Sequence, residues 1–241
     1  MTDKKKELFK SIFYFFNLLK KKKLNSSEKE YFILNKFVRK NDNVIDIGAN
    51  IGRYTFKLSS IVGKKGTVFS FEPVSKIYLI LISLIFLKNS KNIIPLNLAL
   101  ANRGSFLYVA PLKTLFKKNE PFKYNTYTTS KIIKNSKPNT YATKLDDLNF
   151  FKKISFIKMD CEGYELEVLN GSKNLLKSHK PNLLVEITNS GSLMSYQQKI
   201  NGKQKKIINF LKKIGYKTVN LKFKSRNKLF IHKTNIKKYT F

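Results

Sequence analysis

The chain has 241 residues, of which 42% are hydrophobic and 13% aromatic, and its formal net charge is +33. This composition excludes a wholly disordered chain, and the single cysteine, Cys161, excludes both an internal disulfide and a zinc site of paired cysteines. The charge would suit a polyanionic partner such as nucleic acid. It comes from lysines spread along the chain, however, and only four of the 48 basic residues are arginine. This favours coding bias over a dedicated nucleic-acid surface.

Residues 1–40 are predicted to form an N-terminal helical arm. Apolar side chains recur at helical spacing at Leu8, Ile12, Phe15, Phe16 and Leu19, with lysines on both sides. Such a helix packs on the domain or on a partner subunit, or else residues 1–24 lie in a membrane interface; we favour packing. Ser26, Ser27 and Glu30 match a capping box that would begin a helix ending near Val38.

Residues 41–241 are predicted to form one α/β domain, in which strands and helices alternate. Strands are expected at 43–47, 67–71, 92–98, 107–110, 154–159 and 182–187, helices at 53–62, 74–88, 164–169 and 199–213, and a hairpin at 216–223 and 228–232. This pattern indicates a mostly parallel sheet with an antiparallel edge hairpin and helices on both faces. Residues 111–143 lack a period and are expected to form a substrate loop or a surface insertion. No segment is long enough to span a membrane and no signal peptide is evident, so a cytoplasmic protein is expected.

The first strand leads into a glycine turn. Asp46 precedes Gly48, Asn50 and Gly52, and Glu72 follows the second strand, so both carboxylates should lie at the carboxyl edge of the sheet. The glycine spacing differs from G-x-G-x-x-G, and the acid would repel a pyrophosphate but attract a cation. We therefore predict S-adenosylmethionine as cofactor, with Glu72 on the ribose. The alternative is that Asp46 only caps the turn.

Two further carboxylates follow later strands. Asp160 could orient an attacking hydroxyl or accept its proton, and Glu186 could bind substrate or a neighbouring loop. Glu162 could assist them or begin the next helix. Lys158 is expected to face a different side of the strand from Asp160. A lysine-containing tetrad of the kind used in RNA ribose methylation would need a lysine on the fifth strand, which carries Glu186 instead, so no such tetrad is predicted. No spacing compels a metal site, and none is predicted.

The chain resembles the FkbM-type methyltransferases. The resemblance spans about residues 42–220 and is carried by the motifs above with Asn97-Leu98-Ala99-Leu100, Gly104, Leu145-Asp146-Asp147-Leu148, the block from Phe156 to Glu165, and Pro181 to Glu186. It implies a Rossmann-like fold with strand order 3-2-1-4-5-7-6. It also implies that S-adenosylmethionine is held by Asp46, Gly48, Asn50, Gly52, Tyr54, Glu72, Leu98, Ala99 and Asp160, with Leu98 and Ala99 bordering the adenine.

The predicted function is therefore O-methylation of a hydroxyl, which the resemblance implies to be on a sugar, glycan or glycolipid. Asp160 and Glu186 are the predicted catalytic residues. The alternatives are an RNA 2′-O-methyltransferase that uses the lysine-rich surface, and a non-enzymatic basic binding protein on this fold. The partners expected are a hydroxyl-bearing carbohydrate, less readily a nucleic acid, and a membrane surface through residues 1–24.

Overall fold

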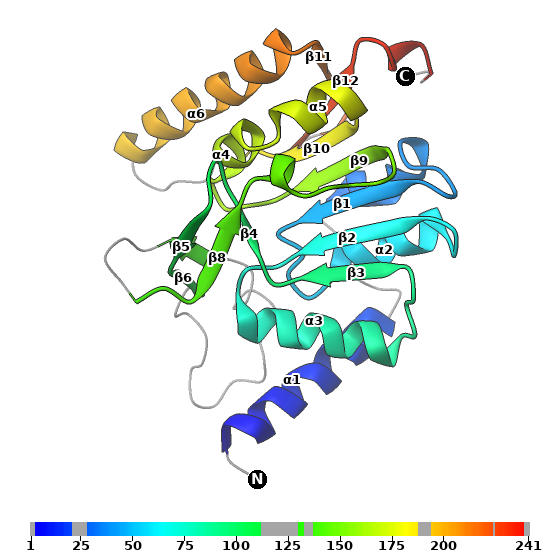
Figure 1. Cartoon of the computed structure of the whole chain (residues 1–241), viewed down its shortest axis with the longest axis vertical. Coiled ribbons are helices and arrows are strands. Elements are labelled where there is room, and N and C mark those ends of the chain that lie inside the picture. The colour runs from blue at the N-terminus through cyan, green and yellow to red at the C-terminus, as the bar shows by residue number, and fades with distance from the viewer. Residues whose placement is uncertain are drawn as a thin grey trace.

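A computed structural model describes residues 3–20, 28–111, 130–132, 137–187, 194–223 and 225–238. In this part of the chain a seven-stranded sheet has the order β11-β12-β10-β9-β1-β2-β3 (Figure 1). Its strands are β1 Asn43–Ile47, β2 Thr67–Phe71, β3 Ile93–Leu96, β9 Ile154–Met159, β10 Asn182–Glu186, β11 Tyr216–Val219 and β12 Asn227–His232. The run from β3 to β10 is parallel, and β12 is antiparallel to both β10 and β11, so the sheet is mixed.

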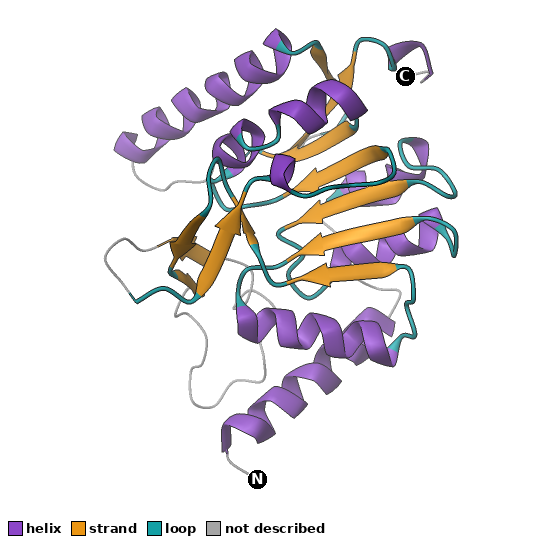
Figure 2. Cartoon of the chain, viewed as in Figure 1, coloured by secondary structure: helices purple, strands orange, loops and turns teal. Residues whose placement is uncertain are grey.

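Helices cover both faces of this sheet (Figure 2). They are α2 Arg53–Val62, α3 Ser75–Leu87, α4 Glu165–Asn170, α5 Lys173–His179 and α6 Met194–Lys213. Neighbouring residues of one strand serve opposite faces: Ile45 packs in one apolar cluster with Val168 of α4, whereas Val44 packs in another with Leu58 of α2. This alternation explains why β1 and β10 are buried along their whole length and mostly apolar.

The strand predicted at 92–98 is shorter in the structure, and a separate strand follows it. β3 ends at Leu96, and β4, Ala99–Leu100, joins a three-stranded sheet with β5, Ser105–Leu107, and β8, Thr140–Thr143. A further pair joins β6, Val109–Pro111, to β7, Ser130–Ile132. The predicted loop at 111–143 thus contains strands, and its residues 112–129 and 133–136 lie outside the described residues. The three-stranded sheet stands beyond the carboxyl ends of the main strands (Figure 1).

The N-terminal arm contains α1, Asp3–Lys20, which packs on α3 through the buried Phe15. Residues 21–27 and the side chains of 18–20, Leu19 included, lie outside the described residues. Ser26 and Ser27 of the predicted capping box are among these undescribed residues, so the box stays a prediction, and the helix expected to follow it is not an α-helix. The segment is a 3-10 helix, η1 Lys29–Lys36, and Glu28 at its start makes no capping hydrogen bond. The carboxylates of Glu28 and Glu30 instead bind partners far along the chain.

Short 3-10 turns complete the described structure: η3, Leu145–Asp147, before β9, and η4, Ile236–Lys238, after β12. Among the described residues, no helix combines the length and the apolar character needed to cross a bilayer.

Candidate active site at the carboxyl ends of the strands

The glycine turn after β1 packs directly on the end of β9. Gly48 has a φ of 78°, and a Cβ on it would lie 1.9 Å from the carbonyl oxygen of Asp160. The backbone amides of Gly48 and Ala49 both donate to the carbonyl of Phe71, at 3.0 and 2.9 Å. Only glycine combines that backbone conformation with so close an approach, so the turn and Asp160 form one rigid unit.

Glu72 ties this turn to the next one. Its two carboxylate oxygens accept hydrogen bonds from the backbone amides of Asn50 and Val74, each at 2.9 Å. The side chain is buried, and this burial raises the pKa of Glu72 to about 7. The structure therefore gives Glu72 a role in holding the turn, and its contact with a ribose stays a prediction.

Asp46 lies beneath the turn, between β1 and α2. Its carboxylate accepts a hydrogen bond of 2.6 Å from the hydroxyl of Thr55, which in turn accepts one from Ser70 at 3.1 Å. Burial raises the pKa of Asp46 to about 6. Since its side chain is 1% exposed, its contact with the methionine end of a cofactor also stays a prediction.

Asp160 and Glu186, the predicted catalytic residues, lie side by side at the ends of β9 and β10 and share a hydrogen bond. Lys158 is buried below them with its Nζ 3.5 Å from Oδ2 of Asp160. The expectation that Lys158 faces away from Asp160 is wrong, because side chains two residues apart on a strand point to the same face. Arg226 flanks the pair from the other side, with Nε 3.5 Å from Oε1 of Glu186.

This environment shifts the pKa values of the two carboxyl groups in opposite directions. Burial and the hydrogen bond shared with Asp160 raise the pKa of Glu186 to about 9. Burial also acts to raise the pKa of Asp160, but the positive charge of Lys158 and the hydrogen bonds from Glu186 and Lys158 outweigh it, so this pKa lies below its usual value. Near neutral pH the pair therefore holds one proton, on Glu186, and Asp160 is ionised.

An ionic network missed by the sequence analysis joins the N-terminal segment to this pair. Glu28 accepts a hydrogen bond of 2.9 Å from the hydroxyl of Tyr54 and lies 3.2 Å from Nη1 of Arg53 and 4.0 Å from Nη2 of Arg226. The Nζ of Lys158 lies over the ring of Tyr54, 4.9 Å from its centroid, in a cation–π contact. The scarcity of arginine was the available signal, since two of the four arginines meet at this one glutamate.

The other candidate residues take different places. Glu165, the first residue of α4, binds the loop that precedes the helix, because its carboxylate accepts hydrogen bonds from the backbone amides of Cys161 and Gly163 at 3.0 and 3.1 Å. Leu98 is half-buried in the link between β3 and β4, and Ala99 is buried as the first residue of β4. Among the residues that the structure describes, no group of three or more His, Cys, Asp or Glu side chains is arranged to hold a metal ion.

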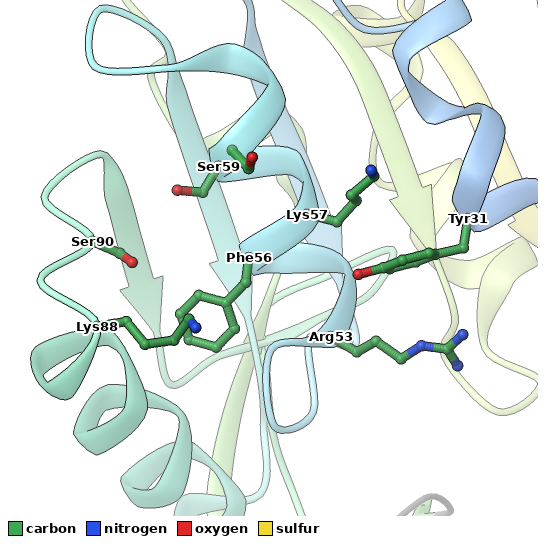
Figure 3. Close-up of a pocket in the computed structure, with 8 residues that line it drawn as sticks. Tyr31, Arg53, Phe56, Lys57, Ser59, Lys88 and Ser90 are labelled. Carbon is green, nitrogen blue, oxygen red and sulfur yellow. The ribbon is translucent and has the colours of Figure 1, made fainter. Parts of the chain in front are cut away.

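A cavity of about 400 Å³ lies elsewhere, over the outer face of α2 (Figure 3). Its lining residues are Tyr31, Arg53, Phe56, Lys57, Ser59, Ser60, Lys88 and Ser90, so it contains three cations and no carboxylate. The ring of Tyr31 lies between the side chains of Arg53 and Lys57 (Figure 3), at 5.0 and 5.7 Å from its centroid. These contacts fasten η1 to α2. The lining does not suit a cationic cofactor, and the cavity is not the active site.

Comparison with known proteins agrees with this architecture. The family model described as methyltransferase FkbM domain matches residues 46–218, more than half of the chain. The crystal structure of methyltransferase FkbM from Methylobacillus flagellatus is similar, with a TM-score of 0.51 and 18% identity over 79% of this chain and 43% of that one. A SAM-dependent O-methyltransferase from Thermotoga maritima has a TM-score of 0.51 and 10% identity, over 87% of this chain and 68% of that one. No curated protein matches the sequence. At these identities the structural likeness is one of fold.

Proposed function

The chain belongs to the FkbM methyltransferase family, whose methyl donor is S-adenosylmethionine, and we propose that it methylates a hydroxyl group of a sugar in a glycan or glycolipid. One observation carries the chemistry of the proposal: the end of β9 at Asp160 lies directly against the glycine turn, and the Asp160 carboxylate has the Nζ of Lys158 at 3.5 Å. This chain spans less than half of the M. flagellatus protein, so the identity of the acceptor does not follow from that similarity and is itself proposed.

The residues at this edge fit such a cofactor. The turn from Gly48 to Gly52, Asn50 included, would hold its methionine end, and Glu72 would hold its ribose. Asp46, Glu72 and Asp160 place three carboxyl groups at the edge where a positive sulfonium would lie, which compensates its charge. When bound, the cofactor supplies a methyl group on a positively charged sulfur.

Asp160 is placed to handle the acceptor. We propose that it orients the acceptor hydroxyl and takes up the proton that the hydroxyl loses. A bound cofactor would supply the methyl group to that oxygen, and its sulfur would leave as a neutral thioether. Glu186 keeps its own proton and donates a hydrogen bond to Asp160. Lys158 and Arg226 compensate the negative charge of the pair from below and from the side.

Calorimetry and methyl transfer test the proposal together. Wild-type protein should bind S-adenosylmethionine and transfer labelled methyl to members of a glycan and glycolipid panel. Asp46→Ala should abolish cofactor binding, and Asp160→Ala should largely spare it. No binding by the wild type would refute the cofactor assignment, and label appearing in RNA alone would refute the sugar acceptor.

Cofactor binding should release protons near pH 6.5. The pKa of Asp46 is about 6 and that of Glu72 about 7, so both groups are partly protonated there, and a bound cation favours their ionised forms. Affinity should therefore rise with pH between about 5.5 and 7.5. Calorimetry in buffers of different ionisation enthalpy measures the release. S-adenosylhomocysteine, whose sulfur is neutral, should release fewer protons, and net proton uptake would contradict the expectation.

Replacing Lys158 by methionine should move the acidic limb of the pH profile of kcat/KM to higher pH. The ammonium group is the cation nearest to Asp160 and lowers its pKa, so its loss makes Asp160 protonate at a higher pH. The profile of Lys152→Met, which removes an exposed lysine ahead of β9, should match wild type. An unshifted limb in folded Lys158→Met protein would show that Asp160 is not the titrating base.

An RNA 2′-O-methyltransferase is a second candidate, because the structure brings a lysine to the catalytic aspartate where none was expected. The net charge of +33 would aid its binding to a polyanion. In that case the labelled product would be RNA, and substrate affinity would fall steeply with added salt.

A further inference from the structure

The helices α1 and α3 form an outer layer at one end of the molecule (Figure 1). They bind each other through one face of α1, where Phe15 packs among Ile77, Ile80 and Leu84 of α3. The layer is separate from the catalytic carboxylates, and α1 precedes the residues that match the family. Its role is therefore not explained by the proposed reaction.

The layer exposes large apolar side chains. Phe9 and Phe13 of α1 are 63% and 69% exposed, and they lie one helical turn apart on the same stripe. On α3, Phe86 is 83% exposed, and Leu79 and Leu87 are also exposed. Single exposed apolar residues are ordinary, but each of these helices exposes more than one at helical spacing, which is typical of an interaction surface.

Lysines accompany these side chains. Lys5, Lys6 and Lys10 are exposed on α1, and Lys76 and Lys88 are exposed at the two ends of α3. In the sequence, residues 3–23 carry eight lysines and two acidic residues. Phenyl rings flanked by lysines match a bilayer interface, in which the rings enter the headgroup region and the ammonium groups meet lipid phosphates.

We propose that the exposed face of the α1–α3 layer docks on an anionic membrane surface. The positive charge of the lysines favours an anionic membrane over the other possible partners of this surface. Two copies of a chain of charge +33 repel each other, and the buried centres of protein interfaces are depleted in lysine. A nucleic acid would use the lysines but would leave the aliphatic Leu79 and Leu87 without a role. Docking of this face does not depend on the methyl transfer reaction.

A single tryptophan can report this docking, because the chain contains none. Phe13→Trp protein should show a blue-shifted emission with vesicles of phosphatidylcholine and phosphatidylglycerol, and brominated lipids should quench it. Vesicles of phosphatidylcholine alone should give a much smaller change. Phe151→Trp is the matched control, because Phe151 is 95% exposed in the turn before β9, and its emission should not respond.

A second test removes the side chains that are proposed to contact the membrane. Replacing Phe9 and Phe13 together by serine should weaken vesicle binding at least about tenfold, and each of Lys5, Lys6 and Lys10 replaced by glutamine should weaken it about fivefold at low salt. Phe151→Ser should have no effect. Equal binding to neutral vesicles, or no loss with the serine variant, would overturn the proposal. The proposal would also be overturned if the emission of Phe13→Trp protein shifted only at high protein concentration, which indicates binding to a second copy of the chain. A shift only on addition of RNA would overturn it as well.

Discussion

Asp160→Asn is expected to lower the rate of methyl transfer by about 10²–10⁴-fold, while the affinity for S-adenosylmethionine changes by no more than a few-fold. The asparagine amide can still contact a hydroxyl, but it cannot take up the proton that leaves as the new bond forms. Asp160 is the ionised member of its pair, so this substitution removes the one carboxylate that is ready to accept a proton.

Glu186→Gln is the informative comparison. Because Glu186 retains its proton up to a pKa of about 9, a glutamine amide reproduces its hydrogen-bond donor, and we expect a much smaller loss of rate. Asp147→Asn makes the same change from carboxyl to amide in an exposed ion pair with Lys144 and should leave the rate unchanged. If Glu186→Gln were the more damaging change, the assignment of base and donor would have to be reversed. The rates are measured with labelled cofactor under single-turnover conditions.

Gly48→Ala is expected to lower both the stability of the fold and the affinity for the cofactor. The added methyl group would lie 1.9 Å from the carbonyl oxygen of Asp160, so either the turn or the end of β9 must move. Overpacking of this kind costs about 1–3 kcal/mol, and the left-handed conformation at a φ of 78° adds roughly 1–2 kcal/mol. Denaturant unfolding measures the loss of stability, and calorimetry measures the loss of affinity for the cofactor.

Gly163→Ala separates the two contributions. Gly163 has a φ of 98° but nothing lies within 4 Å of a Cβ built on it, so only the backbone strain applies. This variant should lose roughly 1–2 kcal/mol of stability and keep its affinity for the cofactor. Equal losses of stability in the two variants would mean that the turn and β9 can move apart to accommodate the added methyl group at little cost in free energy.

Local signals made much of this site predictable. Gly48 and Gly52 predict a turn that only glycine tolerates, and the apolar strands ending near Asp160 and Glu186 place both carboxylates at one edge of a parallel sheet. These inferences need only the period of a strand and the direction of the chain, and both can be found in consecutive residues.

Contacts between distant parts of the chain were not predictable in this way. Glu28 meets Arg226 across almost the whole sequence, and Glu30 meets Asn227. No local pattern encodes such pairs. The sequence predicted that the Glu30 carboxylate would cap a helix, whereas the structure pairs it with the side chain of Asn227, nearly two hundred residues away.

The sequence by itself determined the α/β class, the glycine turn and the carboxylates at the edge of the sheet, because each depends on backbone sterics and on periodicity along a short segment. Only the tertiary structure decided what those carboxylates do. It buried Asp46 and Glu72 as supports of the turn, brought Lys158 against Asp160, and left the shared proton on Glu186. Protonation depends on burial and on neighbouring charges in space, and these arise when strands and loops that are far apart in the chain come together.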